Sequence, residues 1–420
     1  MANQDQVYHR AAGIDISKSD AKVCVRTLKE GHVRYTQITK VFGSTMAEIR
    51  ALRAWLIDEQ IESVVMESTS AYWKSFYDGL TGAGFEVVLA NATRVKQLKG
   101  RKTDISDAAW LAKLACLDMA PPSFVPPRQI RDLRLMTRAR VKLVQRRTAT
   151  TTSLEKMLED TGMKLSAVSS KLLTVSGRNI LEAVCRGCVD PVELAKLSRL
   201  RKTSGSDLVD ALEACIRPGH VVLIRSYLDQ IDFLDSQIEI MDKVIAEAVA
   251  PYKKQIDLLI AIPGIEEVLA RTIIGEIGVD MSVFPTPSHL AAWAGLAPGS
   301  NESAGKSRHA KTRKGNKYLK ASMSQAARSA VKRQDTFFHA RFQRICVRQG
   351  KAKAYTATAH SMLNAIWAML TKHELYQDHG ADFYTRTATP ARQARLQANA
   401  EAQLTRLGVK YVILKPVNHL

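Results

Sequence analysis

Short β-type runs and helical spacings of apolar residues alternate along the first third of the chain. Ala12–Ile16 and Ala21–Thr27 are apolar runs separated by a polar turn, which predicts a β-hairpin, and alternation across His32–Thr39 predicts a third strand. The later pattern predicts a helix capped by Ser44 or Thr45 and ending near Asp58, a strand at Ser63–Met66, a helix from Ser70 to Gly82, a strand at Phe85–Ala90 and a helix at Asp104–Leu117. This order of elements is that of an RNase H-like α/β fold, so we predict such a domain over residues 8–125.

The middle of the chain carries a helical pattern. Four prolines between positions 121 and 127 predict a linker. A coiled-coil-like seam follows, with apolar residues at spacings of three and four: Leu228, Ile231, Leu234, Ile238, Met241 and Ile245. We therefore predict an all-α segment over residues 126–250, in which two long helices pair within the chain or between chains.

The C-terminal third begins with two apolar helices joined by a tight turn. Leu258–Ile274 has this pattern, with Gly264 in the turn. It is typical of a helix-hairpin-helix, in which backbone amides after the glycine face a phosphate, and a plain αα-hairpin is the alternative. We predict a mostly α-helical domain over residues 251–380, and the tail at 381–420 has no predicted role.

The net charge of the chain indicates the kind of partner that it binds. The 420-residue chain has a formal net charge of +20. A surplus of this size favours a polyanion, because cations placed on phosphates release counterions. The charge is clustered, which favours nucleic acid over a uniformly solvated surface. The candidate nucleic-acid-binding residues are Arg134, Arg138, Arg146, Gly264, Lys306, Arg308, Lys311, Arg313, Lys314, Lys317 and Lys320.

Several classes of protein are disfavoured. The first residues, MANQDQVYHR, have no apolar segment typical of a signal peptide, and no apolar run approaches the ~20 residues that span a bilayer. We therefore expect a cytoplasmic, nucleoid-associated protein without a membrane partner. Its six cysteines are expected to be reduced. Cys185 and Cys188 form a lone C-x-x-C, which we interpret as a chance spacing because no second pair stands at zinc-ligand spacing.

Four carboxylates fall at corresponding places in the predicted fold. Asp15 lies inside the first strand, Glu67 ends the fourth, and Asp104 and Asp107 stand three apart at the start of the last helix. If the first and fourth strands are neighbours, all four converge, and cations are needed to neutralise their repulsion. Carboxylate oxygens suit Mg²⁺ or Mn²⁺, and two such ions can support phosphoryl transfer. Taken singly, each has a simpler explanation, such as a helix-dipole acid for Asp104.

Ser303 is the candidate nucleophile. It lies in a small, glycine-containing loop, ESAGK, which is followed by many cations and no acid as far as Arg333. A serine in such surroundings can reach a phosphodiester, and the cations can stabilise the developing charge. An ordinary loop serine is the alternative.

The chain resembles the DEDD transposases of insertion sequences (the IS-one-ten group), which are relatives of the pilin-gene invertases. The resemblance rests on GIDISK, VVMESTSAYW, RKTDISDAAWLAKL, IPGIEEVLARTIIGEIG, LAAWAGLAPGS and SAGKSRHAKTRKGNKYLK. It covers roughly residues 8–125 and 255–380. The motifs are specific as an ordered set and much weaker singly.

The resemblance implies a mechanism and partners. It implies that Asp15, Glu67, Asp104 and Asp107 form a divalent-metal site in a RuvC-like domain, and that Ser303 forms a covalent phosphoserine link to DNA. It implies a homo-oligomer, a dimer or tetramer, in which carboxylates and serine from different subunits form a composite site. It also implies a structured bridge RNA that pairs with element-end and target DNA. Here Ala304 follows Ser303 where many relatives have glycine, so Ser300 and Ser307 are alternative nucleophiles. Lys320 replaces a frequent arginine.

Two other functions remain open on sequence grounds. A Holliday-junction endonuclease would use the same carboxylates with metal ions and water, and would leave the C-terminal serine without a task. A non-catalytic nucleic-acid-binding protein is the third hypothesis. Four carboxylates near phosphate argue against it, because they repel the ligand.

Overall fold

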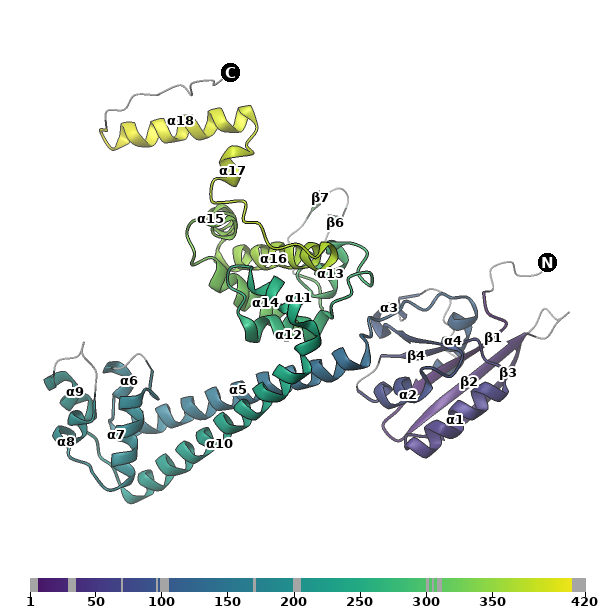
Figure 1. Ribbon diagram of the computed structural model, residues 1–420, viewed down its shortest axis with the longest axis horizontal. Helices are drawn as coiled ribbons and strands as arrows, with labels where there is room; N and C mark the ends of the chain where they lie inside the picture. Colours follow the sequence, from purple (N-terminus) through teal and green to yellow (C-terminus); the bar gives the residue numbers. More distant parts are fainter. Residues whose placement is uncertain are drawn as a thin grey trace. The chain divides into compact units, whose positions relative to one another are not determined.

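The structure is a computed structural model that describes residues 7–28, 35–68, 71–95, 97–98, 106–168, 171–198, 205–299, 302–303, 306–307 and 312–409. Its contacts divide the chain into a first unit, residues 1–125, and a second unit, residues 126–420 (Figure 1). Across the described ranges, we find no helix with both the length and the apolar character needed to cross a membrane.

The first unit is built on a five-stranded sheet with the order β3-β2-β1-β4-β5. Its strands are β1 (Arg10–Ile16), β2 (Asp20–Leu28), β3 (Tyr35–Gly43), β4 (Ser63–Glu67) and β5 (Glu86–Ala90). The β1–β2 and β2–β3 pairs are antiparallel, whereas β1–β4 and β4–β5 are parallel. The expected pairing of the first and fourth strands is therefore confirmed.

Helices cover both faces of this sheet. They are α1 (Met46–Asp58), α2 (Trp73–Leu80), α3 (Ala92–Val95) and α4 (Asp107–Cys116). Alternate residues of β1 point to opposite faces. Ile14 and its neighbours on one face pack with α1 and α2, and Ala11 on the other face packs with Trp110 and Leu114 of α4.

Local signals in the sequence account for most of these boundaries. The Thr45 side chain accepts a hydrogen bond from the amide of Glu48, so the predicted cap of α1 is confirmed. The third strand continues to Gly43, four residues beyond its expected end, because it pairs with β2 along its whole length. The expected helix start at Asp104 lies outside the described residues. The described helix begins at Asp107, with Ser106 as its cap.

The second unit opens with a long helical arm (Figure 1). Helices α5 (Arg128–Thr161) and α10 (Pro218–Ala248) pack along each other, so the predicted seam is formed within the chain. Between them lie α6 (Leu165–Val168), α7 (Val175–Cys185), α8 (Pro191–Lys196) and α9 (Gly205–Leu212). These share an apolar core with the adjoining ends of α5 and α10.

Two ion pairs join the helices of the arm. Arg140 bonds to Asp242 and Arg147 bonds to Asp235, each through both oxygens of the carboxylate. The partners lie seven residues apart on both helices, the spacing at which a heptad seam repeats.

The rest of the second unit is mainly helical. After the 3₁₀ turn η1 (Ala250–Tyr252) come α11 (Lys253–Ile260), α12 (Glu267–Ile277), α13 (Pro287–Trp293), β6 (Glu302–Ser303), β7 (Lys306–Ser307), α14 (Lys317–Ala330), α15 (Phe337–Gln349), α16 (Lys351–Lys372), α17 (Phe383–Arg386) and α18 (Pro390–Arg406). The prediction of an α/β beginning and a mostly helical remainder is confirmed.

Gly264 joins α11 to α12 in a left-handed conformation, with φ of +86°. A side chain at this position would place its Cβ 2.5 Å from the backbone nitrogen of Ala330 in α14. Glycine is thus required both for the turn and for the close approach of α14. The structure contains the predicted pair of helices, and a phosphate contact at their turn stays a prediction.

Replacing Gly13 tests how closely α4 approaches the sheet. A Cβ on Gly13 would lie 2.2 Å from the carbonyl oxygen of Ala108 and 2.2 Å from the amide nitrogen of Ala112. We expect Gly13→Ala to destabilise the first unit by about 1–3 kcal/mol, which lowers amide protection in β1 and α4 by about 5- to 150-fold. Hydrogen–deuterium exchange of the full chain measures this. Gly219→Ala is the control, since its Cβ meets nothing within 4 Å. Unchanged exchange in β1 and α4 would contradict the expectation.

Candidate active site and nucleic-acid surface

Three of the predicted carboxylates lie on one side of the sheet in the first unit. Residues two or four positions apart in a strand share a face, so Asp15 lies on the face of Ala11 and Glu67 on the face of Val65. Ala11 and Val65 both pack against α4. Ile14 pairs with Met66 in the parallel β1–β4 ladder, so Asp15 and Glu67 follow at the same level. Asp107 is the first residue of α4, and the contact of that helix with Gly13 holds it beside β1.

The environment of Asp15 disfavours its charged form. Burial, and then the charges of Asp107 and Glu67, raises the pKa of Asp15 above its ordinary value. Asp15 and Glu67 are half-buried, whereas Asp107 is exposed. The arrangement therefore concentrates negative charge at the ends of β1 and β4, which favours binding of a cation.

The donor set fits a hard divalent cation in its chemistry. All three residues offer carboxylate oxygens, the ligands that Mg²⁺ and Mn²⁺ prefer. Within the described ranges, however, no three His, Cys, Asp or Glu side chains stand close enough together to hold a metal ion. Asp104, the fourth predicted ligand, lies outside those ranges.

Lys22 is a residue at this site that the sequence analysis did not single out. It is the β2 partner of Asp15 in the antiparallel β1–β2 ladder, and its charge acts to lower the pKa of Asp15. Directly opposed residues of antiparallel strands lie on the same face. The sequence places Lys22 in the second predicted strand. Only the register between β1 and β2 shows that it lies opposite Asp15.

Ser303 lies in a short β-hairpin of the second unit. Its backbone pairs with Lys306, and Glu302 pairs with Ser307. Pro298 and Thr312 form an isolated antiparallel bridge on either side of this hairpin. Of the alternative nucleophiles, Ser307 lies in β7 and Ser300 lies outside the described residues.

The predicted basic residues near the hairpin differ in their surroundings. Arg313, Lys314 and Lys317 are exposed, and the Lys320 Nζ donates a hydrogen bond of 2.7 Å to the Thr312 Oγ1. Arg308 and Lys311 lie outside the described residues. The exposed cations give this end of α14 a positive surface.

Arg134 and Arg138 of α5 are half-buried and bonded to α12. Arg138 donates hydrogen bonds of 2.7 and 2.8 Å to the two carboxylate oxygens of Glu276 in α12. Arg134 donates to the carbonyl oxygens of Gly275 and Glu276, and burial lowers its pKa to about 10. Both arginines thus have an intramolecular task, and Arg146 is exposed on the same helix. Nucleic-acid contact by these three residues stays a prediction.

A groove of 740 Å³ lies between α5, α12 and α14. Four cationic side chains line it: Arg138, Arg140, Lys142 and Lys317. The two arginines are engaged by carboxylates, and the two lysines are exposed. Gly264 also borders the groove, which therefore gathers predicted nucleic-acid residues from three segments of the sequence.

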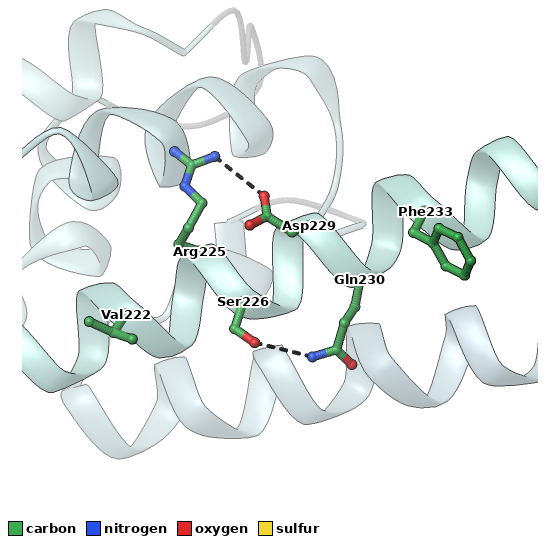
Figure 2. Close-up of a pocket in the computed structure, with 6 residues that line it drawn as sticks. All are labelled: Val222, Arg225, Ser226, Asp229, Gln230 and Phe233. Atoms are coloured by element: carbon green, nitrogen blue, oxygen red, sulfur yellow. Dashed lines mark hydrogen bonds and ion pairs between the residues drawn. The ribbon is translucent and has the colours of Figure 1, made fainter.

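A second, shallow pocket lies along α10 (Figure 2). Arg225 faces Asp229 and Ser226 bonds to Gln230, which are pairs within the same helix. Val222 and Phe233 are exposed at its two ends. The lining residues provide no nucleophile paired with a base, so this pocket is a poor candidate for catalysis.

Two regions of the chain match models of transposase families, and each region contains one of the candidate sites. Residues 12–163 match a transposase model of the IS110 DEDD group, and residues 256–343 match a model described as the transposase IS116/IS110/IS902 family. The transposase for insertion sequence element IS1111A of Coxiella burnetii is 24% identical over 377 residues, which are 87% of this chain and 90% of that protein. The insertion element IS900 uncharacterized 42 kDa protein of Mycobacterium paratuberculosis is 27% identical over 300 residues, 66% of this chain and 73% of that protein.

Removing the charge of Asp15 should stabilise the protein in a pH-dependent way. The pKa of Asp15 is raised in the folded state, so its contribution to stability is full below its ordinary pKa of 3.8 and is lost as the pH rises through the folded value. We expect Asp15→Asn to raise the thermal midpoint in EDTA at about pH 8 and to have little effect at about pH 4. Calorimetry at both pH values measures this. A variant less stable than wild type at the higher pH would refute the inference that the folded site disfavours the charge of Asp15.

Proposed function

The chain belongs to the IS116/IS110/IS902 family of transposases, and we propose that it cuts and rejoins DNA with a carboxylate-bound divalent cation and the nucleophile Ser303. Family membership indicates a DNA-processing enzyme. The observation that carries the finer proposal is the placement of Asp15 beside Glu67 and Asp107, where burial and then the charges of these two residues raise the pKa of Asp15; all three residues lie within the matched region. We also propose that the first unit has an RNase H-like (RuvC-like) fold and that α11 and α12 form a helix-hairpin-helix.

In the proposed reaction, the Ser303 Oγ attacks the phosphorus of a phosphodiester. A serine–phosphorus ester forms, the bond from phosphorus to one strand breaks, and that strand leaves as a hydroxyl that takes up the serine proton. The hydroxyl of the exchanged strand then attacks the ester, and the serine regains a proton. One ester replaces another at each step, so no nucleotide hydrolysis is needed.

The carboxylates have the complementary task of holding the cation. Asp15, Glu67 and Asp107, together with Asp104, would bind Mg²⁺ or Mn²⁺, and the cation would supply charge stabilisation to the phosphoryl oxygens. Lys22 limits the negative charge beside Asp15. The chain's own contribution is therefore to hold several carboxylates at one place.

Nucleic acid would bind to the cationic surfaces of the second unit. The exposed lysines of the groove and the residues before α14 are suited to phosphates. The resemblance to bridge-RNA-guided recombinases extends this proposal to a structured guide RNA and to a homo-oligomer. In such a system base pairing reads the sequence, and the protein binds backbone.

A covalent adduct distinguishes this proposal from a metal-dependent endonuclease. With Mg²⁺, labelled element-junction DNA and co-purified RNA, we expect a labelled band that migrates with the protein on a denaturing gel. Ser303→Ala should abolish it, because no other group would form the ester. Ser300→Ala and Ser307→Ala are the matched controls and should retain it. Nicked DNA without an adduct would favour the endonuclease, and an adduct retained by Ser303→Ala would reject Ser303.

The two lysines of the groove provide a test of nucleic-acid binding. If Lys142 and Lys317 each contact a phosphate, the double substitution to glutamine should reduce the slope of log affinity against log salt by about 2. Titration of labelled DNA or RNA at several salt concentrations measures the slope. The matched control changes Lys156 and Lys243, which are exposed outside the groove, to glutamine. An equal effect of both double variants would indicate that only net charge matters.

A further inference from the structure

The Glu276 carboxylate is a junction between three segments of the second unit. Its side chain is 0% exposed. Besides the two hydrogen bonds from Arg138, it accepts one of 2.6 Å from the Asn316 Nδ2. Arg134 adds a charge at 3.7 Å and bonds to the Glu276 carbonyl oxygen at 2.6 Å. This set, Glu276 with Arg134, Arg138 and Asn316, is called the Glu276 junction below.

Asn316 has two tasks at once. Its Oδ1 caps α14 by accepting hydrogen bonds from the amides of Tyr318 and Leu319, at 3.0 and 3.1 Å. Its Nδ2 donates to Glu276. Ser, Thr, Asp and Asn all cap helices well, but of these only Asn also carries an amide donor. Capping alone therefore does not account for asparagine at this position.

The segment before Asn316 pairs with the segment that precedes β6; the two flank the Ser303 hairpin in sequence, and their contacts are called its base here. Thr312 pairs with Pro298, and the Arg313 amide donates to the Ala297 carbonyl oxygen at 3.4 Å. The Asn316 amide donates to the Trp293 carbonyl oxygen at 3.0 Å. A Cβ on Gly315 would lie 2.3 Å from the Gly295 nitrogen, so the two segments at this base are in close backbone contact.

We propose that Glu276 and Asn316 are positioning residues, which fix the base of the Ser303 hairpin to helix α5. The proposal rests on Ser303 as the nucleophile. A buried ion cluster is weak evidence for stability, since apolar side chains of similar volume often serve as well. The cluster does fix the relative orientation of its members, because bidentate and amide hydrogen bonds hold their partners in one geometry. A misplacement of about 1 Å at a reacting group can reduce a rate 10²-fold.

Asn316→Ser separates the two tasks of the asparagine. Serine retains the cap of α14 but is too short to keep the bond to Glu276. We expect single-turnover formation of the Ser303–DNA adduct, at saturating DNA, to slow by about 10- to 100-fold. The dissociation constant for DNA and the thermal midpoint should stay near wild type. Asn316→Asp should slow the adduct at least as much, because it keeps the cap but places a second carboxylate against Glu276.

Thr336→Ala is the control for a loss of stability alone. In the wild type, the Thr336 side chain caps α15 by accepting a hydrogen bond from the amide of His339. The substitution removes this cap and leaves the Glu276 junction intact. This variant should form the adduct at the wild-type rate. Wild-type kinetics in Asn316→Ser, or equal slowing in both variants, would overturn the proposal. Absence of a Ser303-dependent adduct from the wild-type protein would instead reject the proposed function, and this inference with it.

Discussion

Burial of the Glu276 carboxylate removes it from water, and the groups around it must replace the hydration that it loses. They do so with Arg138, Arg134 and Asn316, which come from α5 and from the start of α14. The bonds therefore specify where three helices of the second unit meet. Removal of Arg138 would leave the buried Glu276 carboxylate without its bidentate partner, which costs more than the pair contributes when intact.

The first unit depends on a different constraint, the absence of a side chain at Gly13. This glycine lets α4 lie against the backbone of β1, and the start of α4 consequently carries Asp107 toward Asp15. The close contact at Gly13 therefore helps to place Asp107 beside β1. Burial, and then the charges of Asp107 and Glu67, raise the pKa of Asp15, so the site holds a charge arrangement that folding alone would not favour.

Sequence patterns were sufficient where the signal is local. The cap at Thr45 and the strand predicted at Ala12–Ile16 depend on neighbouring residues, and the structure agrees with both. The seam of α10 was equally readable, although only the structure decides that its partner is α5 of the same chain.

The remainder depended on partners that are distant in sequence. Arg134 and Arg138 looked like surface cations, because Glu276 lies more than 130 residues away. Glu276 itself was visible as the single acid in the apolar stretch TIIGEIG, a pattern typical of a buried and paired carboxylate. Nothing local could identify which cations it pairs with. The role of Lys22 likewise became apparent only from the register of β1 and β2.

The two ion pairs of the arm determine its register. An apolar seam with a heptad repeat tolerates sliding by seven residues, since each step again places apolar side chains together. Here such a step would bring Arg140 opposite Asp235 but would leave Arg147 facing Leu228, which lies in the apolar core with α6–α9. Only one alignment satisfies both arginines. The arm therefore has a fixed length, and the helices at its far end stand at a set distance from the Glu276 junction.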